Sequence, residues 1–555
     1  MRLPPVLARG RGPRQLALAG LTGAVVGLVV AGFDWVATEI LFGITYELPT
    51  WEQAIAPGVG LLATALLLRY PGRKATPATA DEYVRAFHDR SARLPLRLVP
   101  VRLAAGIATI GTGGALGLEG PAVYAGAGIG DSIQHWLSRY FSREERRLLL
   151  VAGAAAGVAA IFKTPATGVV FALEVPYRSD LARRALLPAL VSAVASYLVF
   201  VSLTGTDPVF PSFGVRPTLE WSGLGGALAI GLLAGLAARG FAWLIRQAKV
   251  TAESLRLRWR LPLGAVVLGA LVVLSQGVFE ETLTMGPGYA AVAWAADPDH
   301  AVGLVVLLLG LRVIATATTL GAGGSGGLFI PLAAQGVLIG RIVGDVLGQA
   351  ESSLYPTIGL AAFLGAGYRV PLAAVMFVAE STGGSAYVVP ALLAAAVSQL
   401  VTGPASVSMY QRDRGRGHLE ERLDLRITSG LVTDVLTVPS DAVLEEFVWS
   451  HALGRRQRAV PVVDGSRYVG MCVLADVVAI DRSEWATTTV GEVARRDAPA
   501  AHASWTLREA LATMEDADVD IVAVVEDDPD GATFVGVVTA ADLLALGDIL
   551  DETGA

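Results

Sequence analysis

Hydrophobic residues dominate the chain from about residue 16 to residue 410, in runs separated by only short polar breaks. A helix needs roughly 20 apolar residues to cross a bilayer, and several of these runs reach that length. Other runs are shorter, and many are interrupted by Gly or Pro. Short, broken hydrophobic segments are typical of transporters built from repeats. The pattern therefore predicts a polytopic, all-helical membrane domain over residues 16–410.

Spacings inside this domain repeat between its two halves. The segment 121–130 begins with Pro and ends with Ile-Gly, and so does the segment 331–340. The segments 162–174 and 368–380 each start with an aromatic and a basic residue and carry Pro, Phe and a final Glu in the same register. Matches in the same order indicate a duplicated core. Hydropathy alone leaves open whether the two halves are inverted.

The ends of the chain differ from the middle. Residues 1–15 and the linker 411–427 are rich in Arg, which places both ends of the membrane domain in the cytoplasm by the positive-inside rule. Two further units, 428–486 and 487–548, each contain two β-branched runs followed by a helix start at an aspartate. A small α/β domain pair is therefore expected after the membrane domain.

Composition narrows the function. Only 17% of the 555 residues are charged, below the roughly 25% of soluble domains. The net charge of −7 comes largely from the C-terminal part and gives no support for nucleic-acid binding. Cys472 is the only cysteine and the six histidines form no cluster, so neither a disulfide nor a metal site is expected. No enzyme constellation is visible, and no cofactor is required.

One carboxylate stands out in the first half. Glu119 is the only charge between residues 103 and 130, and a lone charge in such a segment is a functional-site hypothesis by default. The segment 111–121 places glycines before Pro121, which predicts a helix start with free N–H groups and a positive dipole end. Such a start holds an anion, and the carboxylate would compete with it. The alternatives are a simple helix cap and glycines that serve only close helix packing.

The second half repeats this arrangement without the carboxylate. The segment 321–331 again sets a Gly-rich turn before a proline, and no Asp or Glu lies between residues 302 and 343. Two helix starts from two repeats can meet near the middle of the membrane. A cation site would instead need carboxylates and carbonyls, so an anion site is favoured.

These motifs resemble those of the CLC family of chloride channels and proton–chloride exchangers. Residues 117–121 match the family's GxEGP motif, residues 327–331 match its GxFxP motif, and Tyr410 falls where the family has its pore tyrosine. The resemblance implies two inverted repeats of broken helices, a homodimer with one pore per subunit, and Glu119 as the gate. The positions it implies for anion binding are Gly117, Gly120, Pro121, Gly327, Leu328, Phe329, Ile330, Pro331, Tyr410 and Lys74.

Two departures from the family bear on mechanism. The family's first motif has a serine that coordinates the anion, and here Lys74 is expected at its place; the alternative is a lysine snorkelling at the inner mouth. Exchangers of the family usually carry a second glutamate as an inner proton relay, and Val175 stands at that position. Glu174, one residue earlier, would point about 100° aside on a helix. Val175 favours a passive channel.

The C-terminal units resemble the paired CBS domains found in many CLC proteins. Such pairs bind adenine nucleotides through a threonine and an aspartate. The second unit keeps both, as Thr539 and Asp542, whereas the first has Val473 and Asp476. The resemblance therefore suggests an adenine nucleotide in at most one intact site. A dimer contact without nucleotide is the alternative.

Together these observations favour a dimeric, voltage- or pH-gated chloride channel of a prokaryotic inner membrane, gated by Glu119. A proton-coupled chloride exchanger is the alternative. Because Lys74 replaces a serine, fluoride, nitrate or another anion is a further candidate. A membrane-anchored nucleotide sensor is a remote one.

Overall fold

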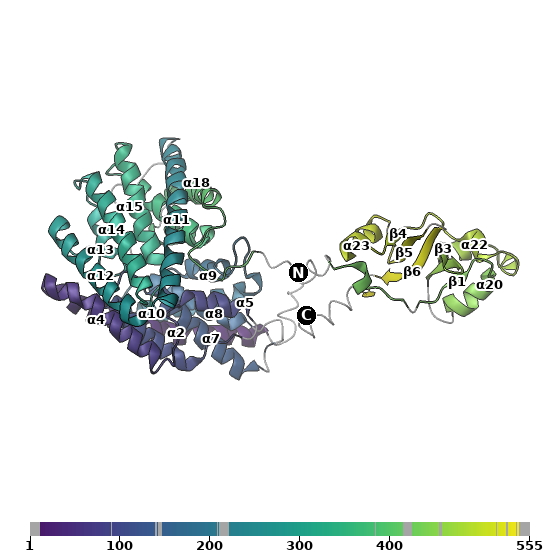
Figure 1. Ribbon diagram of the computed structural model, residues 1–555, viewed down its shortest axis with the longest axis horizontal. Coiled ribbons are helices and arrows are strands. Elements are labelled where there is room, and N and C mark those ends of the chain that lie inside the picture. Colours follow the sequence, from purple (N-terminus) through teal and green to yellow (C-terminus); the bar gives the residue numbers. More distant parts are fainter. Residues whose placement is uncertain are drawn as a thin grey trace. The chain divides into compact units, whose positions relative to one another are not determined.

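The structure is a computed structural model and describes residues 12–89, 92–138, 141, 147–207, 209, 221–382, 385–413, 425–433, 435–453, 458–517, 519–528, 531–539 and 541–542. The chain divides into a membrane unit, Met1–Arg414, and a tail unit, Gly415–Ala555. Figure 1 shows the first as helices and the second as a sheet with short helices. Each unit is described by itself.

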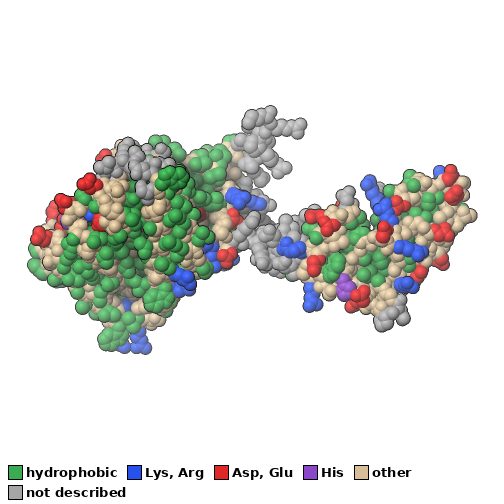
Figure 2. All heavy atoms as spheres, turned by 90° about the horizontal axis from the view of Figure 1, so that it is seen from above, with side chains coloured by type: hydrophobic (Ala, Val, Ile, Leu, Met, Phe, Trp, Pro, Cys, Tyr) green, Lys and Arg blue, Asp and Glu red, His purple; other side chains and the backbone are tan. Residues whose placement is uncertain are grey.

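The membrane unit is helical throughout. Among the described residues, seven helical stretches are long and apolar enough to cross a membrane. Hydrophobic side chains cover much of its surface in Figure 2, as lipid contact requires. Its elements are α2 (Gly12–Asp34), η1 (Trp35–Phe42), α3 (Gly43–Glu47), α4 (Thr50–Arg69), α5 (Ala80–His88), η2 (Leu96–Leu98), α6 (Val99–Ile110), α7 (Glu119–Trp136), α8 (Leu148–Phe162), α9 (Pro165–Glu174), η4 (Arg183–Ala185), α10 (Leu186–Thr204), α11 (Trp221–Ser254), α12 (Leu257–Phe279), α13 (Tyr289–Ala295), α14 (Val302–Gly321), α15 (Phe329–Val346), α16 (Leu354–Tyr368), α17 (Pro371–Thr382) and α18 (Ser385–Thr402).

The predicted duplication is present in the order and packing of these helices. Helices α6 to α10 correspond to α14 to α18, with α7 and α15 equal in length and α8 and α16 equal in length. The same partners pack in each half: α7 on α8 and α15 on α16, then α2 on α10 and α11 on α18. Helices α8 and α16 both end at a basic residue in the left-handed region, Lys163 and Arg369, as the repeated sequence pattern suggests.

Matched glycines allow the closest of these packings. A Cβ on Gly126 of α7 would overlap the carbonyl of Gly153 on α8, and a Cβ on Gly153 would overlap the carbonyl of Gly126. Gly336 and Gly359 make the same pair between α15 and α16. Small residues that let helix backbones touch are a main means of packing in membranes, where the hydrophobic effect between helices is absent.

The halves are inverted, as the CLC resemblance implies. Helix α9 ends at Glu174, whose carboxylate accepts hydrogen bonds from the first turn of α17. Glu380, near the end of α17, accepts hydrogen bonds from the first turn of α9. The two helices therefore run antiparallel and are exchanged by a two-fold rotation. Since equivalent helices of the two halves run in opposite directions, the halves have opposite orientations.

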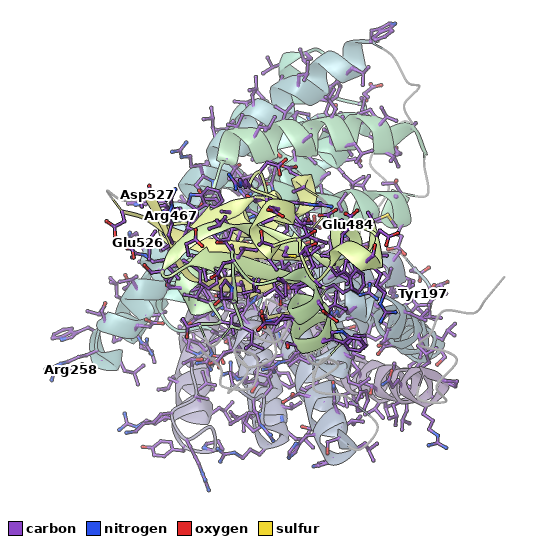
Figure 3. All side chains as sticks on the ribbon, turned by 90° about the vertical axis from the view of Figure 1, so that its right-hand side faces the viewer. Tyr197, Arg258, Arg467, Glu484, Glu526 and Asp527 are labelled. Carbon is purple, nitrogen blue, oxygen red and sulfur yellow. The ribbon has the colours of Figure 1, made fainter. Side chains whose placement is uncertain are left out.

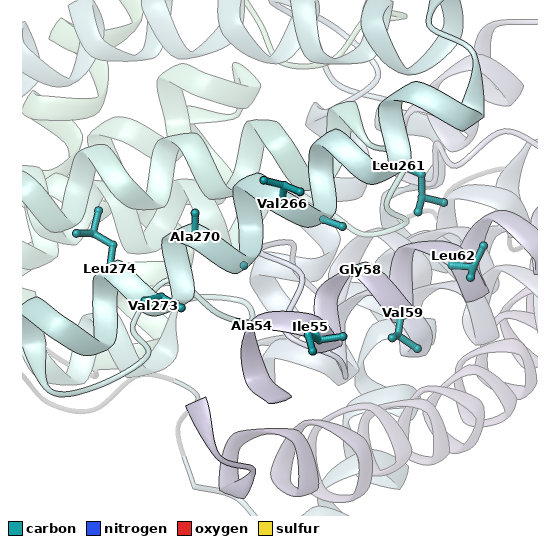
Figure 4. A pocket seen from close by; sticks show the side chains of 12 residues that line it. Ala54, Ile55, Gly58, Val59, Leu62, Leu261, Val266, Ala270, Val273 and Leu274 are labelled. Carbon is teal, nitrogen blue, oxygen red and sulfur yellow. The ribbon is translucent and has the colours of Figure 1, made fainter. Parts of the chain in front are cut away.

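An apolar groove lies between α4 and α12 in the surface of this unit (Figure 4). Its lining contains only Ala, Gly, Val, Leu and Ile side chains, among them Val59 on α4 and Val266 on α12, and both are more than half exposed. A groove without polar groups offers nothing to hold an ion. It is part of the lipid-facing surface and lies apart from the site described below.

The tail unit is one six-stranded sheet in the order β1-β2-β3-β6-β5-β4. The first and last pairs are parallel and the others antiparallel, so the sheet has internal two-fold symmetry. Its elements are η5 (Ile427–Ser429), β1 (Val438–Pro439), α20 (Leu444–Glu446), η6 (Phe447–Leu453), β2 (Ala459–Asp464), β3 (Arg467–Val473), α21 (Leu474–Val478), η7 (Arg482–Glu484), α22 (Val490–Val493), β4 (Ala500–His502), α23 (Leu507–Asp516), β5 (Ile521–Asp528) and β6 (Gly531–Thr539).

The two halves of this sheet exchange their leading segments. Val432 bridges to Val537, so the start of the first predicted unit pairs with the second. Arg495, in the second predicted unit, bridges to Met471 in the first. A boundary at residues 486–487 therefore separates the two sequence repeats, but segments on either side of it pack against the opposite half of the sheet. At one end of the central strands, Arg467 of β3 and Glu526 of β5 both lie opposite Thr533 of the strand between them, β6. Arg467 and the acidic pair 526–527 lie close together in Figure 3.

Candidate anion site

The two Gly-rich turns meet at the centre of the membrane unit and pair with each other. Gly117 N–H donates to the Gly327 carbonyl at 2.8 Å, and Gly327 N–H donates to the Gly117 carbonyl at 2.7 Å. Gly113 and Gly323 precede them with φ angles of +98° and +93°, which only glycine adopts easily. The two helix starts therefore meet in the structure, as the sequence predicted.

Two threonines hold the turns together across the repeat. Ser325 N–H donates to the Thr109 hydroxyl at 3.0 Å, and Ala115 N–H donates to the Thr319 hydroxyl at 3.1 Å. All four residues are buried. Each half thus satisfies a backbone N–H of the other, so the site is rigid only when both halves are in place.

Helix α7 begins at Glu119 and helix α15 begins at Phe329, with Pro121 and Pro331 at matching positions in their first turns. The sequence predicted both helix starts. At such a start the first N–H groups have no partner within the helix and the dipole is positive. Phe329 and Ile330 thereby present backbone donors to one place without any full positive charge.

Glu119 fills that place. Its side chain is fully buried, and Oε1 accepts the Phe329 N–H at 2.5 Å. Its other oxygen, Oε2, has no hydrogen-bond partner. A Cβ on either Gly117 or Gly327 would overlap the carboxylate. The carboxylate therefore sits in a cradle that only glycines permit, at the point where an α15-bound anion would lie.

Aromatic side chains wall the site on one side. The Phe329 ring lies 4.4 Å from that of Phe162, and Phe171 and Phe377 complete the cluster. Such a wall excludes water and lowers the local dielectric, so charge–dipole interactions at the helix start are stronger than in water.

Tyr368 joins this cluster with a polar group. Its hydroxyl accepts the Leu328 N–H at 3.3 Å, and its ring packs edge-on against Phe171. It is one of the residues that sequence reasoning missed. The signal was there: Tyr368 is the repeat counterpart of Phe162, differing by a hydroxyl at a buried position.

Tyr410 is placed differently. Tyr410 is 41% exposed, and the charged groups that act on it are Arg85, Asp81 and Glu82 of α5 and Glu253 of α11. Among the described residues, Tyr368 is the tyrosine whose hydroxyl lies at the paired turns. A role for Tyr410 as an anion ligand stays a prediction.

Lys74 does not occupy the position expected for it. It is exposed, in a turn with φ +65° that follows α4. The hydroxyl at the paired turns comes instead from Thr79, at the start of α5, which donates to the Gly326 carbonyl at 2.9 Å. Arg73 and Lys74 are consecutive left-handed residues, and they turn the chain between α4 and α5.

Glu174 and Glu380 form reciprocal helix caps. Glu174 accepts N–H groups of Leu372 and Ala373 at 3.2 and 2.9 Å. Glu380 accepts those of Ala166 and Thr167 at 2.9 and 2.7 Å. Carboxylates at helix N-termini are stabilised by the unpaired N–H groups and by the dipole. This matches helix packing as a role for both glutamates.

Val175 follows Glu174 and is buried. It offers no titratable group, and its carbonyl accepts the side-chain amide of Gln411 at 3.0 Å. The same amide donates to the Tyr368 carbonyl at 2.8 Å. The exit segment of the membrane unit is thereby tied to helix ends from both halves.

In the tail unit, the predicted nucleotide residues make local contacts. The Asp542 carboxylate accepts the Thr539 hydroxyl at 2.6 Å and its N–H at 3.1 Å. Asp476 forms a two-bond ion pair with Arg495, at 2.5 and 2.7 Å, and this pairing lowers the pKa of Asp476. Only the Thr539–Asp542 pair retains a hydroxyl beside its carboxylate.

Comparison with known proteins adds the following. A family model described as voltage gated chloride channel matches residues 59–403, and a CBS domain model matches residues 490–547. A ClcB-like chloride channel protein of Ralstonia nicotianae is 30% identical over 425 residues, covering 72% of this chain and 97% of the relative.

Other relatives carry a different description. An H(+)/Cl(-) exchange transporter ClcA of Vibrio cholerae is 28% identical over 407 residues, covering 68% of this chain and 84% of the relative. A slow cyanobacterial Cl-/H+ antiporter shares the fold with a TM-score of 0.63 at 21% identity, covering 70% of this chain and 94% of the other.

Proposed function

The chain belongs to the CLC family of voltage-gated chloride channels and transporters, and from that premise we propose that it exchanges chloride for protons across the membrane, with Glu119 as gate and proton carrier. The observation that carries the proposal is the buried Glu119 carboxylate on the Phe329 N–H. A carboxylate that takes an anion's place can be displaced by that anion or removed by protonation.

The exchange cycle follows from this competition. Ionised Glu119 closes the anion position, because its negative charge and a chloride cannot share the same backbone donors. Protonation removes the charge and weakens the bond to the Phe329 N–H, since charge-assisted hydrogen bonds are about twice as strong as neutral ones. The neutral side chain then leaves, chloride takes the donors, and the proton travels with the side chain. The displaced side chain gives its proton to the solution, and the carboxylate that forms then returns and expels the chloride.

A passive chloride channel is the second candidate. It is favoured by Val175, which supplies no inner proton relay, and by the engagement of Glu174 with the start of α17. The sequence alone favours this channel. The relatives include exchange transporters as well as channels, so exchange is supported at least as well.

The identity of the anion follows the family and not Lys74. The exposed position of Lys74 removes the reason to expect fluoride or nitrate instead of chloride. A homodimer in a prokaryotic inner membrane, with both termini in the cytoplasm, completes the proposal. It rests on the resemblance and on the basic segments that flank the membrane unit.

For the tail unit we propose an adenine nucleotide at the Thr539–Asp542 pair. The hydroxyl and carboxylate at a strand-to-helix junction support this, because both can hydrogen-bond ribose and phosphate. The Asp476 side is occupied by Arg495.

Chloride efflux from proteoliposomes, with external pH recorded, separates the two candidates. Uphill proton movement driven by the chloride gradient is expected. Chloride flux without proton movement would make the protein a channel, and no flux of chloride would overturn both.

A further inference from the structure

The apolar groove between α4 and α12 is long as well as open. Its α12 wall extends from Leu261 to Leu274, about 20 Å along the helix axis, and its volume is about 840 Å³. Figure 4 shows Leu62 and Leu261 together at one end and Leu274 at the other. The hydrocarbon core of a bilayer is about 30 Å thick, so one leaflet contributes about 15 Å of it. The groove can therefore hold one acyl chain that lies along the two helices.

Small residues at the floor of the groove fix the register of its two walls. A Cβ on Gly58 of α4 would contact the Ala265 side chain of α12, and a Cβ on Gly269 of α12 would contact the Ala54 carbonyl of α4. The helices therefore run antiparallel, and the last turns of α4 lie beside the first turn of α12. Because α4 is the second long apolar stretch after the basic N-terminal segment, this end lies on the side that the proposed function places in the cytoplasm.

The groove-lining face of each helix ends in an arginine at this side. On α4, Arg69 comes seven residues after Leu62, so the two lie on one helical face. On α12, Arg258 comes three residues before Leu261 and shares its face in the same way. Both arginines are exposed. Two guanidinium groups, one from each wall, thus stand at the same end of an apolar groove.

An aromatic residue follows each of these arginines. The Arg69 guanidinium carbon lies 5.9 Å from the ring centre of Tyr70, and that of Arg258 lies 5.8 Å from the ring centre of Trp259. Both aromatic residues are more than half exposed. Tyrosine and tryptophan are enriched where a membrane meets water. This end of the groove therefore lies at the level of the lipid headgroups.

The arginines at this end have no counter-ion in the described part of the chain, since neither Arg69 nor Arg258 forms an ion pair there. Arg256 and Arg260 flank Arg258 on α12, and the Nε of Arg260 is buried without a hydrogen-bond partner. Glu253, near the end of α11, is the acid nearest to α12 along the chain. Basic pockets between helices on the cytoplasmic side bind anionic headgroups, and the planar guanidinium matches a phosphate group.

The opposite faces of the same two helices pack on the turns of the anion site. A Cβ on Gly60 of α4 would overlap Thr112, in the first Gly-rich turn. A Cβ on Gly264 of α12 would overlap Ala322, in the second. A molecule that joins α4 to α12 from the lipid side would therefore support both turns from behind.

We propose that this groove binds one anionic phospholipid per subunit. An acyl chain lies along the groove, and the lipid phosphate accepts hydrogen bonds from the guanidinium groups of Arg69 and Arg258. The bound lipid bridges α4 and α12 and thereby stabilises the packing behind the paired turns. The charge at the end of the groove selects an anionic lipid over a neutral one. The inference goes beyond the proposed function, and its test needs no transport.

The first test is native mass spectrometry of the full-length protein with phosphatidylglycerol or with phosphatidylcholine of the same acyl chains. The wild type is expected to bind phosphatidylglycerol about thirtyfold more tightly, because each arginine near the lipid surface contributes about fivefold. Combining Arg69→Gln with Arg258→Gln should abolish this preference. Arg97→Gln is the matched control, since Arg97 is an exposed arginine in η2, away from the groove, and its loss should leave the preference intact.

A second pair of variants tests the groove apart from the charge. Val266→Trp places a large side chain in the groove and keeps every arginine, so it should weaken the binding of both lipids. Val266 is 69% exposed, so the substitution is compatible with folding. Leu236→Trp on α11 is the control, because Leu236 is 62% exposed and does not line the groove. It should bind both lipids as the wild type does.

Unfolding temperature in detergent gives an independent readout. Phosphatidylglycerol should raise it in the wild type and leave it unchanged when Arg69→Gln and Arg258→Gln are combined. Arg69→Lys with Arg258→Lys keeps the charge without the planar fork and should keep part of the preference. Equal binding of the two lipids by the wild type would overturn the inference, and so would a preference that survives the paired glutamine substitutions. Preferential phosphatidylglycerol binding without any chloride flux would instead contradict the proposed function and leave this site standing.

Discussion

The two halves of the membrane unit have the same arrangement of helices, but different side chains from each half lie at the centre. The first half contributes the Glu119 carboxylate, and the second contributes the Phe329 N–H that holds it. These two residues begin equivalent helices, α7 and α15. Duplication thus supplied two identical helix starts, and divergence made one the acid and the other the donor. A symmetric pair of carboxylates would have repelled the anion, and a symmetric pair of donors would have had no gate.

The same contrast recurs around the centre. Phe162 in the first half corresponds to Tyr368 in the second. The buried Arg102 of α6 corresponds to Arg312 of α14, whose two terminal nitrogens donate to the carbonyls of residues 283–287. Glu174 and Glu380, by comparison, remain equivalent and cap each other's helices. Residues that are equivalent in the two halves therefore stabilise the packing of the helices, and residues that differ give the centre its proposed anion chemistry. Each prediction below changes one member of such a pair.

The largest effect is expected from Gly327→Ala. A Cβ there would overlap the Glu119 carboxylate and the Gly120 N–H, both part of the buried centre. Chloride flux from proteoliposomes should fall to background. Gly310→Ala on α14 is the matched control, because a Cβ at Gly310 meets no atom within 4 Å and its flux should stay at the wild-type rate. Wild-type flux from Gly327→Ala would show that the cradle is not needed.

The next largest effect is expected from Arg312→Gln, which leaves up to five buried carbonyls, those of residues 283–287, without their hydrogen-bond donors. A buried polar group that loses its partner costs about 1–3 kcal/mol, so a loss of at least about 3 kcal/mol in the free energy of unfolding is expected. Thermal unfolding in detergent measures it. Arg102→Gln should cost far less, since the hydrogen bond that it removes, from Nη2 to the Thr76 hydroxyl, is long at 3.4 Å. Equal destabilisation by the two substitutions would contradict the contrast between the arginines.

Glu174→Gln and Glu380→Gln should have smaller and equal effects. Each removes a charge from a helix start, worth about 0.3–1 kcal/mol and up to about 2 in buried geometry. Unfolding temperature and proton–chloride coupling are measured for both. If Glu174→Gln alone abolished coupling, Glu174 would be a proton relay and not only a cap.

The smallest effect is expected in the tail unit. Asp542→Ala should weaken adenine-nucleotide binding about tenfold, corresponding to the loss of one charged hydrogen bond of about 1.4 kcal/mol. Asp476→Ala should leave affinity unchanged, because Arg495 already occupies that carboxylate. Isothermal titration of the full-length protein with ATP measures both. An equal loss in the two variants would place the nucleotide elsewhere.

Much of the fold and of the candidate site could be predicted from the sequence. Charged residues are rare in apolar membrane segments and usually occur there for a functional reason, and glycine and proline together mark helix starts. The helix starts at Glu119 and Phe329, the repeat and the tail pair all follow from local patterns. Glu174 was expected to point aside from the relay position of Val175, and it contacts the start of α17.

Contacts between segments that are distant in the chain could not be predicted from the sequence. Tyr368 reaches Leu328 across a whole helical hairpin, and no periodicity records this. Thr79 was missed in favour of Lys74. Two left-handed residues, Arg73 and Lys74, turn the chain between α4 and α5, and the sequence motif does not indicate this turn. Whether Arg102 has partners depends on which loop folds over it, which its own position in the sequence does not reveal.

The most direct test of the central claim is Glu119→Gln in proteoliposomes, with chloride and proton movement recorded together. Glutamine keeps the shape of the protonated side chain but neither ionises nor carries a proton. Chloride flux that persists without proton movement and without pH dependence is the predicted result. Proton movement or pH dependence that survived the substitution intact would show that the gate and proton carrier lie elsewhere.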